Sequence, residues 1–93
     1  MSVTFRENIF EQINQERDYQ DGKWGVGFDD KNTMNDWFTY IAIYGGRACE
    51  MARTKEEQRK FLLKTATLAV AALEAFDRND GMAPRHYDSP EKE

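Results

Sequence analysis

Acidic side chains are the residues of this chain whose spacing comes nearest to a metal-binding pattern. Glu74 and Asp77 lie three residues apart, so a helix would place both carboxylates on one face, as Mg²⁺ requires. Because this pair stands at a predicted helix end, we interpret it as solvated rather than metal-binding. Asp29, Asp30 and the nearby Asp36 form a second acidic group, which we interpret as turn and helix-cap residues.

Nucleophiles and bases are few. His86 is the only histidine and has no nucleophile in clear register, so it forms no catalytic constellation. Cys49 is the only cysteine, which excludes an internal disulfide and fits a reducing cytoplasm; on an apolar helix we expect it to be a small buried hydrophobe. The glycines between Gly22 and Gly27 lack the lysine and hydroxyl of a phosphate-binding loop. The sequence therefore predicts no catalytic residue, no metal ligand and no cofactor.

The elements that carry these residues are predicted to be helices, so the fold class is all-α. Apolar residues recur at helical spacing in three segments, at about 4–19, 33–53 and 55–78. Thr4 and Thr54 each stand three residues before a glutamate, which is the pattern of a capping box at a helix start. Between the first two helices, the glycine-rich segment from Asp21 to Asn32 is predicted to be a loop that packs onto the bundle.

Two of these helices have wide uncharged middles, from Trp37 to Gly46 and from Thr65 to Leu73. One further helix cannot cover both, so we expect a second copy of the chain to complete the bundle, as a dimer or a higher oligomer. The pair Gly45–Gly46 predicts either a kink or a close approach of another backbone. We assign residues 1–81 to a single helical domain and residues 82–93 to an extended or flexible tail.

Composition narrows the classes of partner. The 93-residue chain has a net charge of −4 with scattered basic residues, which argues against a nucleic-acid partner. No apolar run is long enough to cross a membrane, and the first residues lack the apolar core of a secretion signal. We therefore expect a cytoplasmic protein, located in the host cytoplasm if it is encoded by a phage.

The segment from Glu16 to Gly25 resembles the "ER..Q..KWG" opening of small MazG-like proteins, which are common in bacteriophages. These belong to the all-α nucleoside-triphosphate pyrophosphohydrolase superfamily. Trp37 resembles the tryptophan that begins their next helix, and Ala66 to Arg78 is similar to the end of the helix after that. The resemblance covers about Glu16 to Arg78 and implies a helical fold of this kind.

In that family, the motifs E-E-x-x-E and E-x-x-D hold Mg²⁺ on two successive helices. The resemblance places the first motif at Ile43, Tyr44 and Arg47, and the second at Phe61 and Lys64. None of these residues is acidic, and the two cations would repel Mg²⁺. The resemblance thus implies the fold of the family without its metal site.

The leading hypothesis is a non-catalytic, phage-encoded MazG-like protein that binds a host protein, as an inhibitor or counter-defence factor. Surplus aromatic residues would anchor the interface: Trp24, Phe28, Trp37, Phe38, Tyr40, Tyr44 and Tyr87. One alternative is a nucleotide-binding protein in which Arg47 and Lys64 contact phosphate directly. The other is a Mg²⁺-dependent nucleoside triphosphate pyrophosphohydrolase with an unconventional site. The sequence therefore leaves open whether the protein is an enzyme, although the missing carboxylates argue against enzymatic activity.

Overall fold

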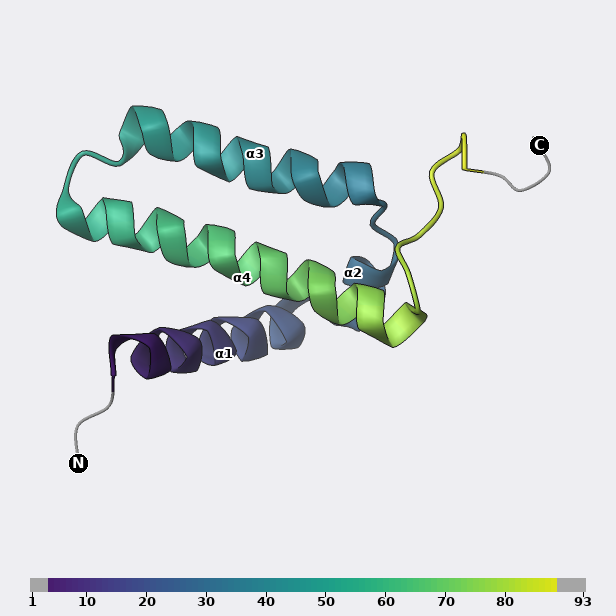
Figure 1. Cartoon of the computed structure of the whole chain (residues 1–93), viewed down its shortest axis with the longest axis horizontal. Helices are drawn as coiled ribbons and strands as arrows, with labels where there is room; N and C mark the ends of the chain where they lie inside the picture. The colour runs from purple at the N-terminus through teal and green to yellow at the C-terminus, as the bar shows by residue number, and fades with distance from the viewer. Residues whose placement is uncertain (1–3, 89–93) are drawn as a thin grey trace.

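The computed structural model describes residues 4–88, which form four α-helices and no strand (Figure 1). In chain order they are α1 (Phe5–Trp24), α2 (Val26–Asp30), α3 (Met34–Met51) and α4 (Lys55–Asn79). The all-α class is confirmed. None of the helices within residues 4–88 combines the length and apolar character that crossing a membrane requires.

Each of the three long helices begins after a threonine, at Thr4, Thr33 and Thr54. In each case the hydroxyl accepts a hydrogen bond from the backbone N–H three residues later. The acid at that later position accepts one from the N–H of the threonine, which completes a capping box. Since a helix start leaves backbone donors unpaired, these boxes fix where the helices begin.

Helix α4 lies in the middle of the molecule, with α3 on one side and α1 on the other (Figure 1). Helices α3 and α4 run antiparallel as a hairpin, and α2 also packs on α4. Helices α1 and α3 make no contact with each other. The space between them, above α4, is where the candidate site lies.

The core is small and centres on one tryptophan. Trp37 of α3 packs against Ala71, Ala72 and Ala75 of α4, with Leu68 half-buried beside them. Alanines on this face of α4 let the tryptophan approach closely, because they occupy little space between the helix axes. The uncharged middle of α4 is thus partly explained by the packing of α3 within one chain.

The prediction of three helices was wrong in the region from Asp21 to Asn32. Helix α1 continues through Gly22 to Trp24, and residues Val26–Asp30 form α2 instead of a loop. Side chains one turn apart support the extension: the Lys23 ammonium lies 5.8 Å from the centre of the Tyr19 ring. Gly25 then ends the helix at φ +78°, a backbone conformation that glycine adopts without strain.

For the glycine pair in α3, the expected close approach of another backbone is not found within the described chain. The helix runs through Gly45 and Gly46, and a Cβ added to either would meet no atom within 4 Å. No other part of the described chain therefore approaches them closely.

Beyond α4, the described part of the predicted tail lies against the start of α3. Met82 packs beside the core, and Ala83 forms a bridge with Thr33. The Asn35 amide donates to the Tyr87 hydroxyl at 2.9 Å, and the Arg85 guanidinium donates to the Asn35 side-chain oxygen at 3.2 Å. Residues 89–93 of the predicted tail fall outside the described residues.

Candidate functional site

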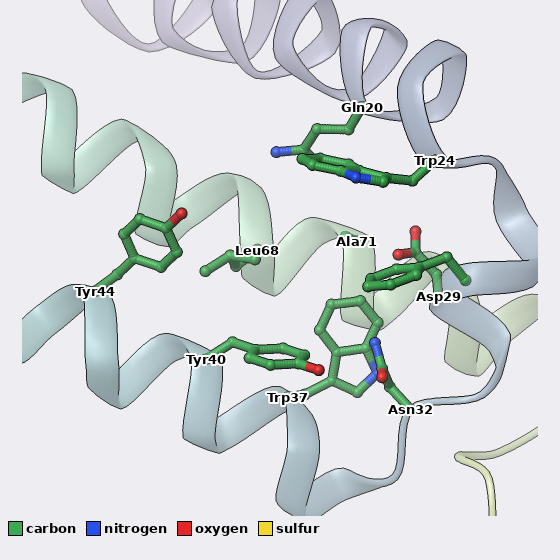
Figure 2. A pocket seen from close by; sticks show the side chains of 10 residues that line it. Gln20, Trp24, Asp29, Asn32, Trp37, Tyr40, Tyr44, Leu68 and Ala71 are labelled. Carbon is green, nitrogen blue, oxygen red and sulfur yellow. The ribbon is translucent and has the colours of Figure 1, made fainter.

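A pocket of about 250 Å³ opens between α1 and α3, with α4 as its floor (Figure 2). Helix α1 contributes one wall, α3 the opposite wall, and α2 closes one end. Half of its lining residues are aromatic, and the amide or carboxylate residues among them are Gln20, Asp29 and Asn32; the full set is Gln20, Trp24, Phe28, Asp29, Asn32, Trp37, Tyr40, Tyr44, Leu68 and Ala71. Four of the aromatic residues that we expected at a protein interface, together with the core residue Trp37, line this pocket.

The aromatic walls form two pairs. Trp24 and Phe28 stack with ring centres 6.2 Å apart and planes 26° apart, and each is about half exposed. Trp37 and Tyr40 meet edge to face, with centres 6.3 Å apart and planes at 88°. The Lys23 ammonium lies 4.8 Å from the Trp24 ring centre. Rings held in this way offer flat apolar surfaces at which a planar molecule can stack.

Two hydrogen-bond donors in this pocket are buried without a partner. The Asn32 side-chain nitrogen (Nδ2) and the Trp37 indole nitrogen (Nε1) have no acceptor among residues 4–88. The residues that carry them are only 8% and 2% exposed. A buried donor left unpaired costs about 1–3 kcal/mol.

Asp29 is the acidic group of the pocket. Its carboxylate is 14% exposed, and this burial raises the pKa of Asp29 above its usual value, although Arg17 acts in the opposite direction. The nearest guanidinium nitrogen of Arg17 lies 3.4 Å from one carboxylate oxygen, Oδ2. Asp29 therefore supplies a hydrogen-bond acceptor in the same pocket as the two unpaired donors.

Arg17 is the buried charge that joins the elements around the pocket. Its Nε and Nη2 donate to one Glu74 oxygen at 2.9 and 2.7 Å, and Nη2 also donates to Asp21 at 3.0 Å. Nη1 donates to Gln20 at 2.8 Å. Burial opposes the charge, but the hydrogen bond and charge of Glu74, followed by Asp21 and Asp29, outweigh it and raise the pKa of Arg17. One guanidinium thus holds α1, α2 and α4 together.

Sequence reasoning missed this role of Arg17. The available signal was its position four residues after Ile13, on the apolar stripe of α1, where a charged side chain has to find buried partners. The partners themselves could not be identified, because Asp29 and Glu74 are distant in sequence. The earlier interpretation of Glu74 as a solvated residue is therefore incomplete, and Asp29 lies in a helix rather than a turn.

Four of the five residues that the resemblance aligns with the metal motifs of MazG-like proteins lie together in the structure. Tyr44 and Arg47 of α3 and Phe61 and Lys64 of α4 line one pocket, together with Lys60, Glu57 and Met51. The Arg47 guanidinium lies 5.9 Å from the Tyr44 ring centre. Ile43 is exposed and does not line this pocket.

The aromatic pocket and this basic pocket lie on either side of a third hollow. That hollow shares Gln20, Trp24, Tyr44 and Leu68 with the first, and Tyr44 and Lys64 with the second. We name these three adjoining hollows the α1–α3 trough. It runs along α4 from Ala71, at the aromatic end, to Lys60, at the basic end.

A separate apolar groove lies between α3 and α4 on another side of Trp37. It is lined only by apolar residues, namely Met34, Trp37, Phe38, Ile41, Ala69, Ala72, Leu73, Phe76 and Met82. Phe38 is 61% exposed and Leu73 62%. Of the predicted interface residues, only Phe38 and Tyr87 lie outside the trough, and Trp37 lies in the core rather than on the surface.

The remaining candidate residues are not gathered into a site. Cys49 is exposed, so the expectation that it is buried was wrong. His86 is exposed and its ring meets the Tyr87 ring edge to face at 5.0 Å. Asp30 accepts hydrogen bonds from Arg78 and Asn79. Within residues 4–88, no three His, Cys, Asp or Glu side chains are grouped so that they could hold a metal ion.

Comparison with known proteins gives no further evidence about this site. No family model, no curated protein and no solved structure matches the chain.

Proposed function

We propose that this chain is a non-catalytic, MazG-like protein that binds a nucleotide in the α1–α3 trough. The base would occupy the aromatic pocket, and the phosphates would lie against Arg47 and Lys64. The observation that carries the proposal is the position of the aromatic pocket, with its flat ring faces, next to a pocket lined by Arg47, Lys60 and Lys64.

The aromatic end of the trough suits a base. Stacking of a base on an aromatic side chain contributes about 1–3 kcal/mol, and it requires flat rings that are already held in place. Trp24 and Phe28 are held by stacking on each other, and Trp37 is fixed in the core.

The basic end suits phosphate without a metal. Helix α4 rises about 1.5 Å per residue, so Lys64 stands about 6 Å from Leu68 and about 10 Å from Ala71 along the axis. A ribose and its phosphates span such a distance. Arg47 and Lys60 add two further cations, whereas Glu57 is engaged in capping Thr54. Cations at these positions can bind phosphate oxygens directly.

Calorimetry tests the proposal. We expect nucleoside triphosphates to bind with a heat that is unchanged by EDTA and reduced by salt, and to release no pyrophosphate. Lys64→Gln should weaken binding of the triphosphate more than binding of the nucleoside. Lys55→Gln, an exposed lysine of the same helix outside the trough, is the matched control.

Two results would overturn the proposal. Absence of heat and of any shift in melting temperature across all common nucleotides would exclude the site. Pyrophosphate release that EDTA abolishes would instead support the alternative of a Mg²⁺-dependent pyrophosphohydrolase with an unconventional site.

We also propose that the apolar groove between α3 and α4 is covered by a second copy of the chain. The groove is lined by apolar residues alone, and Phe38 and Leu73, at its surface, are each more than half exposed. An exposed apolar patch of this kind is typical of a surface that binds another protein chain.

Sedimentation equilibrium tests the dimer, with Phe38→Ser and Leu73→Ser expected to shift the chain towards monomer. Tyr87→Ser, at an exposed aromatic outside the groove, is the control. A wild-type chain that is monomeric at all accessible concentrations would overturn the dimer. It would leave the same groove for a host-protein partner, as expected for a phage-encoded inhibitor or counter-defence factor.

A further inference from the structure

Helix α4 carries an apolar stripe that α1 and α3 leave largely exposed. Its residues are three and four positions apart, so they share one face of the helix: Leu62, Ala66, Ala69, Leu73 and Phe76. Leu62 is 71% exposed and Leu73 62%. Ala69, Leu73 and Phe76 line the apolar groove beside α3, and Leu62 and Ala66 line a second hollow beside α1. On the basis of the proposed dimer, we infer that this stripe packs antiparallel against the same stripe of a second copy.

The middle of the stripe has the same order of residues in both directions. From Leu62 to Leu73 it reads Leu-x3-Ala-x2-Ala-x3-Leu. Two such helices that run in opposite directions place Leu62 opposite the partner's Leu73, and Ala66 opposite the partner's Ala69. A two-fold axis between the alanines generates this arrangement, because each contact in a two-fold interface occurs twice. The small alanines let the helix axes approach, and the leucines close over them on either side.

The charges at the ends of the stripe favour antiparallel over parallel packing. Arg59 lies just before the stripe and Asp77 just after it; both are exposed, and neither is in an ion pair with another of residues 4–88. One guanidinium nitrogen of Arg59 donates to Gln12 at 2.8 Å, which leaves other donors for a partner. Antiparallel packing brings Arg59 next to the partner's Asp77. Parallel packing would instead place like charges side by side, which is unfavourable.

A dimer of this kind leaves the α1–α3 trough accessible. Helix α4 lines the trough with residues that do not belong to the stripe, namely Lys60, Phe61, Lys64, Leu68 and Ala71. Ala71 is two positions from both Ala69 and Leu73, which places it on the opposite side of a helix with 3.6 residues per turn. Dimerisation and nucleotide binding therefore use different faces of α4 and can be tested separately.

Exchange of the two charges tests the pairing, with sedimentation equilibrium as the measurement. Arg59→Asp and Asp77→Arg should each weaken the dimer about tenfold or more, because each turns two attractive contacts into repulsive ones. The double variant should return the dissociation constant to within about threefold of the wild type. Within one chain the two positions lie about 27 Å apart along the helix, so only contact between chains explains such a rescue. Lys60→Asp, the same change at the next residue but in the trough, is the matched control and should leave the dimer within about threefold of the wild type.

Disulfide formation tests the direction and the register of the helices. Because Cys49 is exposed, these variants also carry Cys49→Ser. A chain with both Leu62→Cys and Leu73→Cys should form a covalent dimer on mild oxidation, since the introduced thiols face each other across the interface. Each single variant should run as a monomer on a denaturing gel, because antiparallel packing keeps its two thiols about 16 Å apart along the axis.

The outcomes separate the inference from the dimer on which it rests. Covalent dimers from the single variants would show parallel packing, and a double charge exchange without rescue would exclude the pairing of Arg59 with Asp77. Either result would overturn the inference and leave the proposed dimer in place. A wild-type chain that is monomeric at all accessible concentrations would overturn both.

Discussion

Replacing Arg17 by methionine tests the central role assigned to this guanidinium. The substitution keeps the apolar stem but removes donors to Glu74, Asp21 and Gln20 and the charge near Asp29. Removing one partner of a buried ion pair typically costs about 3–5 kcal/mol. The carboxylates of Glu74 and Asp21 are 43% exposed and can be rehydrated, so we expect the lower end, about 3 kcal/mol.

Urea unfolding, followed by far-ultraviolet circular dichroism, measures this loss. At a slope of about 1.5 kcal/mol per molar urea, the midpoint should fall by about 2 M. Arg6→Met, at an exposed arginine of the same helix, should change the free energy of unfolding by less than about 0.5 kcal/mol. The reasoning would be refuted if Arg17→Met and Arg6→Met were equally mild. Adding Glu74→Gln to Arg17→Met should cost less than the sum of the single changes, because the two residues interact directly.

Three further predictions concern the helices. Gly45→Ala and Gly46→Ala should each raise the free energy of unfolding by about 0.5–1 kcal/mol, because neither new methyl group meets a neighbour; a loss seen only at high protein concentration would instead reveal a second chain packed there. Thr54→Ala should lower it by about 1 kcal/mol through loss of the capping box, whereas Thr54→Ser should retain it, as thermal melts would show. The hydrogen bond from Arg78 lowers the pKa of Asp30 below its usual 3.8, so its stabilising effect is present above pH 4 and is lost as the pH falls further. Asp30→Asn should accordingly be less stable than the wild type at pH 7, and the difference should vanish near pH 2; a constant difference would contradict the assignment.

The sequence predicted the helical architecture well where local signals were strong. Thr4 and Thr54 were identified as helix starts from the acid three residues later, and both carry complete capping boxes. The segment from Asp21 to Asn32 was misread because three glycines in a short stretch are typical of loops. Only Gly25 breaks the helix, since contacts of Lys23 and Arg17 with residues one turn away offset the cost of Gly22.

The candidate site was predicted less completely than the fold. Tyr44, Arg47, Phe61 and Lys64 were identified by resemblance alone, and the structure gathers them in one pocket. The unpaired nitrogens of Asn32 and Trp37 could not be predicted, because a sequence shows which residues have donors but not which donors lack acceptors.

The central position of α4 has a consequence for how the molecule opens. Because α1 and α3 touch α4 but not each other, α1 can detach without disturbing the α3–α4 hairpin. It should therefore form a separate unit of local unfolding, with amide hydrogens that exchange faster than those in the middle of α4. A molecule bound between the two outer helices would bridge units that share no contact of their own, and so would slow exchange in α1 by linking it to α3. The separation of α1 from α3 creates the trough. A molecule that occupies the trough would therefore join two parts of the fold.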